Sequence, residues 1–213
     1  MELFIQFKNI TKGYGKIEVL KNLNLQIGKG ELFGIIGLSG SGKTTLLKTL
    51  IGYLEPEEGD ILFYSFKDRQ YKSVFKNILE VRKTFGFSTQ MPSFYPKLTV
   101  EENLDHFATL YGIKKIERAT RIKELLSLTG LLDYKDLLAE ELSGGMEKRL
   151  SIACSLVHNP TVLILDEPTA DLDPVLRKEI WNLIKDINKR GTTVIVASHL
   201  LKELEEACDR VGI

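Results

Sequence analysis

The chain has 213 residues, of which 43% are hydrophobic and 27% are charged. This is ordinary globular usage, and it excludes a disordered chain, a collagen-like repeat and a small disulfide-rich protein. Lysine plus arginine and aspartate plus glutamate each total 29, so no bulk positive charge draws the chain toward nucleic acid or anionic lipid. No apolar run reaches the ~18 residues that a membrane-spanning helix needs, so we expect the chain not to cross a bilayer on its own.

The two cysteines, Cys154 and Cys208, lie far apart and belong to no paired spacing typical of zinc or redox sites. The N-terminal end lacks the basic segment and apolar stretch of a secretory signal. Both observations favour a reducing compartment, and we expect a cytoplasmic protein.

The N-terminal part contains two segments in which apolar and polar side chains alternate, residues 3–7 and 19–27. A glycine-bearing turn at residues 12–15 separates them, as in antiparallel strands. The sequence therefore predicts a small antiparallel β layer at the front of the fold. Next, a short apolar strand over residues 31–36 runs into a glycine-rich loop, and residues 44–50 have the composition of a helix.

The middle third of the chain has few strand signals. Between Gln90 and Leu142, the Thr99–Glu102 segment has the pattern of a capping box that opens a helix. A second helical pattern covers residues 116–128. We predict an inserted helical subdomain here, at about residues 91–158.

Strand signals return at residues 162–165 and again at residues 193–197. The helix between them has both ends marked, by Asp173 as N-cap, Pro174 at the first position and Gly191 after the last turn. A strand, a crossover helix and a strand of this length indicate a right-handed parallel unit.

The predicted fold class is α/β, with a mostly parallel sheet, the N-terminal antiparallel β layer and the inserted helical subdomain. We predict one domain over residues 1–213.

Residues 37–44 match the P-loop, a glycine-rich turn whose backbone N–H groups wrap the phosphates of a nucleoside triphosphate. Lys43 adds a positive charge for the β- and γ-phosphates, and the Thr44 hydroxyl can ligate Mg²⁺. The helix that follows directs its positive dipole end at the anion. The predicted ATP-binding residues of this segment are Gly37, Ser39, Gly40, Ser41, Gly42, Lys43, Thr44 and Thr45.

Asp166 and Glu167 directly follow an apolar strand, at the edge where α/β sheets bind ligands. We predict that Asp166 holds Mg²⁺ and that Glu167 is the general base that polarises the attacking water. The alternative is that two acids merely end a strand and begin a polar turn.

His199 follows the strand that ends at Ala197 and Ser198, so the parallel topology places it at the same edge. A neutral imidazole can relay a hydrogen bond between the γ-phosphate and water, and the alternative is an ordinary helix-start residue beside a capping serine. Gln90 closes the strand-like segment 84–89 and is a candidate for contact with Mg²⁺ or the attacking water; alternatively, it is only a loop residue.

Ser143, Gly144 and Gly145 open another predicted helix, which runs to about Val157. A helix start with glycines in its first turn is an anion site. Because the P-loop already provides one such site, we predict that this second one serves a nucleotide held by another copy of the chain, in a two-fold head-to-tail dimer. The alternative is a flexible hinge between subdomains.

Together these motifs resemble the ATP-binding cassette (ABC) family. They occur in the family's order over nearly the whole chain: Tyr14, residues 37–44, Gln90, residues 142–145, Asp166 with Glu167, residues 171–173, and His199.

The resemblance implies a role for several residues. In that family the aromatic at the position of Tyr14 stacks on adenine, and residues 143–145 contact the γ-phosphate of ATP bound by the partner subunit. The turn around Asp173 crosses between subunits, and the residue at Glu167 is the catalytic base. The chain departs from the family at Met146, where glutamine is frequent.

The resemblance further implies an ATP-binding and ATP-hydrolysing transporter subunit that pairs with a second such subunit and with separate membrane permease subunits. It would lie on the inner face of the cell membrane through those permeases, use ATP and Mg²⁺, and bind no nucleic acid. Residues 198–201 and 203–210, with Asp173, resemble exporter-type subunits. Such subunits usually continue into further strands, so we expect the chain to be truncated after Ile213.

Two other functions use some of the same residues. A soluble ABC ATPase that acts on DNA, ribosomes or cofactor assembly usually carries coiled-coil arms, zinc modules or a second cassette, and the sequence shows none of these patterns. A P-loop kinase of small metabolites also needs residues 37–44, but it has no use for residues 143–145 or for adjacent acids at 166 and 167.

Overall fold

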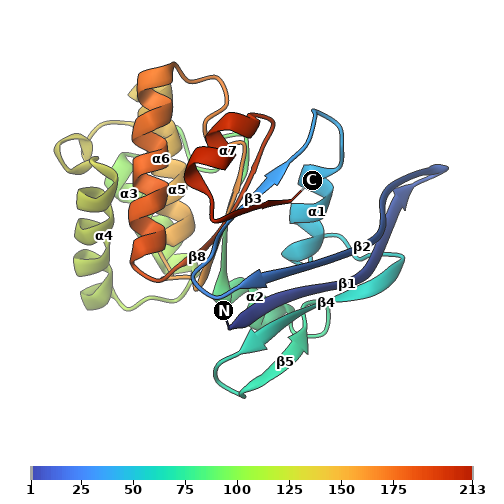
Figure 1. The fold of residues 1–213 in the computed structure, drawn as a ribbon. Helices are drawn as coiled ribbons and strands as arrows, with labels where there is room; N and C mark the ends of the chain where they lie inside the picture. The colour runs from blue at the N-terminus through green and yellow to red at the C-terminus, as the bar shows by residue number, and fades with distance from the viewer. Residues whose placement is uncertain (1, 213) are drawn as a thin grey trace.

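A computed structural model describes residues 2–212 and shows two sheets with helices between and beside them (Figure 1). The strands are β1 Leu3–Tyr14, β2 Ile17–Gly28, β3 Leu32–Ile36, β4 Glu58–Ser65, β5 Gln70–Ser73, β6 Phe85–Ser88, β7 Val162–Asp166, β8 Thr193–Ser198 and β9 Arg210–Gly212. The helices are α1 Lys43–Leu50, α2 Ile78–Thr84, α3 Val100–Leu110, α4 Lys115–Thr129, α5 Gly144–Leu156, α6 Pro174–Lys189 and α7 Leu201–Ala207. None of the helices within residues 2–212 is long and apolar enough to span a membrane.

The central sheet has the strand order β6-β7-β8-β3-β9, and every neighbouring pair is parallel. Its register pairs Asp166 with Ala197 and Ile36 with Ser198. The carboxyl ends of β3, β7 and β8 therefore meet at one edge. The residues that follow these strands are the predicted site residues Gly37, Glu167 and His199, so the topology alone brings three distant segments together.

The hydrophobic core forms on both faces of this sheet. In β7, Leu163 and Leu165 pack with the helices α3 to α6, whereas Val162 and Ile164 pack with α1 and the antiparallel sheet. Figure 1 shows α5 and α6 on one side of the central sheet and α1 on the other. Because both faces are covered, the strands carry continuous apolar runs, which is why they were visible in the sequence.

The N-terminal layer is a four-stranded sheet of order β2-β1-β4-β5 with antiparallel pairing. The predicted turn at residues 12–15 is wrong for its first three positions, since β1 continues to Tyr14. Gly13 pairs with Glu18, and a Cβ at this position would lie 2.8 Å from the Ile17 carbonyl oxygen. The glycine therefore permits close strand approach rather than a turn.

Strands β4 and β5 were not predicted. In β4 only alternate residues are fully buried, among them Ile61 and Phe63, but the intervening Leu62 and Tyr64 are also apolar. The period of two is thus hidden in the sequence, although only one face of β4 is fully buried.

The predicted helix starts are confirmed. Thr99 and Glu102 form a reciprocal capping box, with N···O distances of 3.1 and 2.8 Å, at the start of α3. Asp173 accepts hydrogen bonds from the Val175 and Leu176 amides at 2.8 and 3.0 Å, and Pro174 is the first residue of α6. These caps satisfy N–H groups that have no partner inside the helix.

Candidate functional site

The loop between β3 and α1 takes a shape that requires its glycines. Gly40 and Gly42 have φ values of 80° and 101°, in the left-handed region that other residues avoid. A Cβ on Gly37 would lie 2.3 Å from the Ser41 hydroxyl oxygen, and one on Gly42 would lie 2.6 Å from Val19. The loop is therefore closed on itself and against β2.

Lys43, the first residue of α1, crosses this loop. Its side chain is 8% exposed, and Nζ donates to the carbonyl oxygens of Gly37 and Leu38 at 2.7 and 3.1 Å. Nζ also lies 3.3 Å from Oε1 of Glu167. The ammonium group is thus held at the centre of the loop, where an anion bound by the backbone N–H groups would meet it.

Thr44 and Asp166 form the second contact between α1 and the sheet. The Thr44 hydroxyl donates to Oδ2 of Asp166 at 2.8 Å. Oδ1 of Asp166 is buried and has no hydrogen-bond partner among residues 2–212. Burial raises the pKa of the Asp166 carboxyl, and the hydrogen bond from Thr44 opposes this shift.

An unpartnered buried carboxylate oxygen beside a hydroxyl is a fitting pair of ligands for a hard cation such as Mg²⁺. Such an ion would offset the cost of burying the charged carboxylate. The donor set of Asp166 and Thr44 therefore fits the predicted metal site.

Glu167 joins two of the motifs. It follows β7 in a left-handed conformation, with φ of 50°, and its side chain is 10% exposed. Oε1 faces the Lys43 ammonium and Oε2 lies 2.9 Å from Nδ1 of His199. Because a carboxylate only accepts, Nδ1 carries the proton of this bond, and Nε2 of a neutral imidazole is then the acceptor.

Both oxygens of Glu167 are therefore engaged. Before Glu167 can take a proton from water, one of these contacts must loosen or be shared. Lys43, once drawn to a phosphate, is the contact that a nucleotide would weaken.

A cavity of about 540 Å³ opens in front of these groups. It is lined by Tyr14, Val19, Leu38, Ser39, Gly40, Gly42, Lys43, Thr44, Thr45, Gln90, Glu167 and His199. The volume is within the range of a small-molecule or cofactor site, ~300–1,000 Å³. Tyr14 is 51% exposed, which leaves its ring free for a flat ligand.

Gln90 lines the cavity from the loop after β6, and the structure ties this loop to α5. Nζ of Lys148 donates to the Gln90 carbonyl oxygen at 2.7 Å, and burial lowers the pKa of Lys148. Neither Lys148 nor Val19 was predicted from the sequence. The two ends of the Lys148 contact are 58 residues apart, so no local pattern could have found it.

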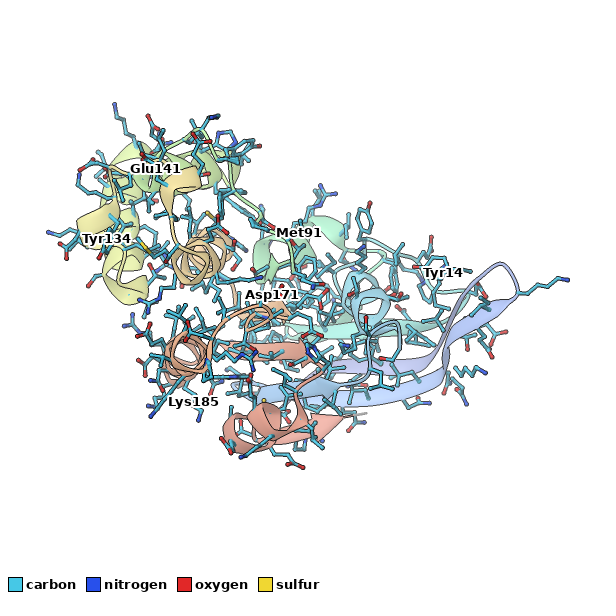
Figure 2. The ribbon with its side chains drawn as sticks, turned by 90° about the horizontal axis from the view of Figure 1, so that it is seen from above. Tyr14, Met91, Tyr134, Glu141, Asp171 and Lys185 are labelled. Atoms are coloured by element: carbon cyan, nitrogen blue, oxygen red, sulfur yellow. The ribbon has the colours of Figure 1, made fainter. Side chains whose placement is uncertain are left out.

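The structure does not bring Ser143, Gly144 and Gly145 into this cavity. In Figure 2, Glu141 lies at the opposite end of the molecule from Tyr14. Ser143 is the N-cap of α5, as predicted, and accepts from the Met146 amide at 3.4 Å.

The two glycines at the start of α5 differ in their surroundings. Gly145 is buried, and a Cβ there would lie 3.0 Å from Leu176 of α6, whereas one on Gly144 would meet only Leu172, at 3.9 Å. A side chain at position 145 would therefore displace the Leu176 methyl groups by a few tenths of an ångström, whereas one at position 144 would make ordinary van der Waals contact.

The other two histidines lie elsewhere. The His158 ring stacks on Tyr111 at 3.8 Å, and its Nε2 lies 3.2 Å from the Phe85 carbonyl oxygen. His106 packs edge-on against Tyr95. Both contacts are those of packing residues. Cys154 and Cys208 are free thiols.

A loop of this shape before a helix, with Asp166, Glu167 and His199 at the same edge of a parallel sheet, defines an ATP-binding domain. Residues 20–170, more than half of the chain, match the family model described as ABC transporter. The chain belongs to the ABC transporter family, as one of its ATP-binding domains, and this family hydrolyses ATP.

Two curated relatives and one solved structure illustrate the similarity. The chain is 41% identical over 211 residues to the methionine import ATP-binding protein MetN of Clostridioides difficile, covering 98% of this chain and 65% of MetN. It is 33% identical over 213 residues to the Nod factor export ATP-binding protein I of Cupriavidus metallidurans, covering 100% of this chain and 68% of the relative.

The structure of cbiO1 from Clostridium perfringens, part of the ABC transporter complex cbiONQ, superposes with a TM-score of 0.89 at 33% identity. The match covers 99% of this chain and 84% of cbiO1. The fold class predicted from the sequence is thereby confirmed. The chain spans just under two thirds of the length of MetN.

Proposed function

We propose that this chain binds ATP with Mg²⁺ in the 540 Å³ cavity and hydrolyses it as the ATP-binding subunit of a transporter. The observation that carries the proposal is the convergence of Lys43, the Thr44–Asp166 pair and the Glu167–His199 pair at one edge of the sheet. A cation for phosphate, ligands for a metal and a candidate base are the groups that phosphoryl transfer to water requires.

In this proposal the P-loop amides and Lys43 bind the phosphates, and the Tyr14 ring stacks on adenine. Thr44, Asp166 and Gln90 hold Mg²⁺, which when bound neutralises charge that develops on the phosphates. The remaining P-loop ligands are Gly37, Ser39, Gly40, Ser41, Gly42 and Thr45.

Glu167 is the proposed general base. Its proton acceptance becomes possible when Lys43 moves its charge to the phosphate and leaves Oε1 free. His199 stays on Oε2, orients the carboxylate and places its second ring nitrogen for contact with the γ-phosphate or the water.

The second half of the site comes from another copy of the chain. We propose that Ser143, Gly144 and Gly145 bind the γ-phosphate of ATP held by the partner, in a head-to-tail dimer. The exposure of Ser143 and Gly144 at the surface supports this arrangement. The turn at residues 171–173 would lie at the same interface.

The dimer would drive separate permease subunits and would lie at the inner face of the cell membrane through them. Within the domain, residues 91–158 form the helical subdomain and, with the loop after Gln90, transmit closure to the permeases. We propose export as the direction, on the exporter-like segments 198–201 and 203–210 and on the similarity to the Nod factor export protein. The similarity to an import protein, MetN, makes import the alternative.

Glu167→Gln tests the proposal. The variant should bind ATP and lose hydrolysis by about a hundredfold or more, because removal of a general base costs ~10²–10⁴ in rate. It should also run as a dimer on a sizing column with ATP and Mg²⁺. The matched control is Glu117→Gln on the exposed face of α4.

Unchanged hydrolysis in Glu167→Gln would reject Glu167 as the base, and a monomer under these conditions would count against the dimer. Co-purification of the chain with an integral membrane protein from its source, followed by transport in inverted and right-side-out vesicles, would decide between export and import. Stimulation by DNA or ribosomes instead would overturn the transporter assignment.

A further inference from the structure

The carboxylate of Glu203, on α7, is the meeting point of three segments. Its Oε2 accepts hydrogen bonds from the Thr169 hydroxyl at 2.9 Å and from the Trp181 indole N–H at 2.8 Å. Its Oε1 lies 3.5 Å from Nη1 of Arg177. Thr169 follows β7, Arg177 and Trp181 belong to α6, and Glu203 itself stands four residues after His199.

Most of this cluster is buried, although Arg177, Trp181 and Glu203 also line a second, open cavity of about 450 Å³. Thr169 is 1% exposed and Trp181 7% exposed, and the Glu203 side chain is 20% exposed. A carboxylate with little solvent needs protein donors, and each of these donors in turn needs an acceptor, so removal of one partner leaves the others unsatisfied. None of these four residues lines the 540 Å³ cavity, so any effect on the reaction must pass through other residues.

The segment that Glu203 anchors is strained. Glu167 and Asp171 have φ values of 50° and 64°, in the left-handed region that non-glycine residues seldom adopt. The local backbone bonds are long: the Leu172 amide donates to the Thr169 carbonyl at 3.4 Å. Such a conformation persists only where the surroundings hold it.

Two side chains in contact with each other hold this segment. Glu203 binds the Thr169 hydroxyl, and Nε of Arg177 donates to the Leu172 carbonyl oxygen at 2.7 Å. Because Arg177 is itself placed by Glu203, both attachments depend on the same carboxylate.

We propose that Glu203 is a positioning residue for ATP hydrolysis, which ties the turn bearing Glu167 to the turn bearing His199. Glu167 and His199 are in contact at 2.9 Å. Glu167 stands two residues before Thr169, and His199 stands four residues before Glu203. The hydrogen bond between Thr169 and Glu203 thus adds a side-chain link between the two turns beyond the strand pairing that ends at Asp166 and Ala197. The proposal rests on the proposed function insofar as Glu167 and His199 act on ATP.

The test compares Thr169→Val with Thr169→Ser. The valine keeps most of the side-chain volume and removes the hydroxyl, whereas the serine restores the donor. Glu203→Gln is the second variant, because its amide oxygen can still accept from Thr169 and Trp181 while the ion pair with Arg177 is lost. Glu205→Gln, exposed on the same helix, is the matched control.

Thr169→Val should lower kcat by about tenfold to a hundredfold, since small misplacement of reacting groups costs up to ~10² in rate. The Kd for ATP should change less than about twofold, because the phosphate ligands are untouched. Thr169→Ser should recover most of kcat, and Glu203→Gln should be intermediate. A merely structural role would lower thermal stability without this split between kcat and ATP affinity.

Amide hydrogen exchange of residues 169–173 gives a readout that needs no hydrolysis. These amides should exchange faster in Thr169→Val than in the wild type and Thr169→Ser. Trp181 is the single tryptophan and donates to the same carboxylate, so its fluorescence reports a change in the position of Glu203. Amide exchange and tryptophan fluorescence are measured for Glu205→Gln as well.

Equal kcat in the wild type, Thr169→Val and Glu203→Gln would overturn the positioning role. Parallel losses of kcat and ATP affinity would also overturn it. If the wild type itself does not hydrolyse ATP, the proposed function fails; the exchange data then decide whether Glu203 anchors the segment, and unchanged exchange rejects it.

Discussion

Two helix N-termini in this molecule look alike in sequence and differ in their surroundings. Helix α1 follows Gly42, which has a left-handed backbone and gives the helix no side-chain cap. Helix α5 follows Ser143, whose hydroxyl accepts from the Met146 amide. Both starts are glycine-rich, and both present the positive end of a helix dipole.

The N-terminus of α1 is surrounded by most of the groups that a nucleotide site needs, whereas the N-terminus of α5 is not. Around α1, the chain gathers Lys43, Asp166 and Glu167, and a cavity opens before them. At α5, Ser143 and Gly144 are exposed, and the acid in the first turn, Glu147, disfavours an isolated anion. A helix dipole alone therefore does not make an anion-binding site, and the N-terminus of α5 needs a second protein surface opposite it.

The largest expected effect is that of Lys43→Ala on the α1 site. Loss of the ammonium removes the charge-assisted contacts to the triphosphate, and ATP affinity should fall by about a hundredfold or more. Isothermal titration calorimetry measures this directly. Lys123→Ala on the exposed side of α4 is the control, and undiminished affinity in Lys43→Ala would contradict the assignment of the α1 site.

A mixing experiment tests whether the α5 terminus serves a second chain. Ser143→Arg and Lys43→Ala should each be inactive alone, because each dimer lacks one half of both sites. Random mixing should restore about a quarter of wild-type activity, since half of the dimers carry one intact site of two. A mixture without any ATPase activity would argue that the whole site lies within one chain.

Lys148 is the direct link between the two regions, from α5 to the loop of Gln90. Lys148→Ala removes a charge-assisted hydrogen bond, and we expect kcat to fall by about tenfold at unchanged ATP affinity. Lys148→Arg should retain much of the rate, because a guanidinium also donates to a carbonyl. Steady-state kinetics of both variants would show the fall in kcat at constant ATP affinity. A kcat for Lys148→Ala equal to that of the wild type would show that the contact between Lys148 and the Gln90 loop does not affect hydrolysis.

The smallest effect concerns stability at the far end of α5. Burial lowers the pKa of His158 to about 4, from 6.5 in the unfolded chain. The unfolded state therefore takes up a proton first as the pH falls, so stability present above pH 6.5 is lost progressively toward pH 4. With partial solvent screening, we expect a loss of about 1 kcal/mol between pH 6.5 and pH 5.

Urea unfolding at several pH values measures this loss. His158→Gln should flatten the profile over that range. An equal slope in the His158 variant would show that the acid sensitivity arises elsewhere. The buried Asp166 is not such a source, because its raised pKa makes the folded state take up a proton more readily as the pH falls.

Much of the fold and of the α1 site could be predicted from the sequence. The strands β3, β7 and β8 are buried on both faces and so appear as apolar runs, and the caps at Thr99 and Asp173 mark their helices directly. By contrast, β4 has apolar residues on both faces, which removes the alternation that a one-sided strand normally shows.

Residues of the candidate site could be predicted where the chemistry of a motif requires one residue type at one position. Lys43 and Asp166 are of this kind. The close contact of Gly145 with Leu176 was not predictable, since Leu176 belongs to a later helix. Lys148 and Glu203 gave no signal, because their contacts join segments far apart in the chain.

The amino-acid sequence by itself determined the phosphate loop, the acids that follow a buried strand and the helix caps, because each depends on neighbours within a few residues. Only the tertiary structure decided that Glu167 is held by Lys43 on one side and His199 on the other, and that Glu203 joins their turns. The physical reason is that parallel strands bring their ends together irrespective of sequence distance. The packing of the folded chain then determines which hydrogen bonds form across that edge, and no local sequence pattern indicates them.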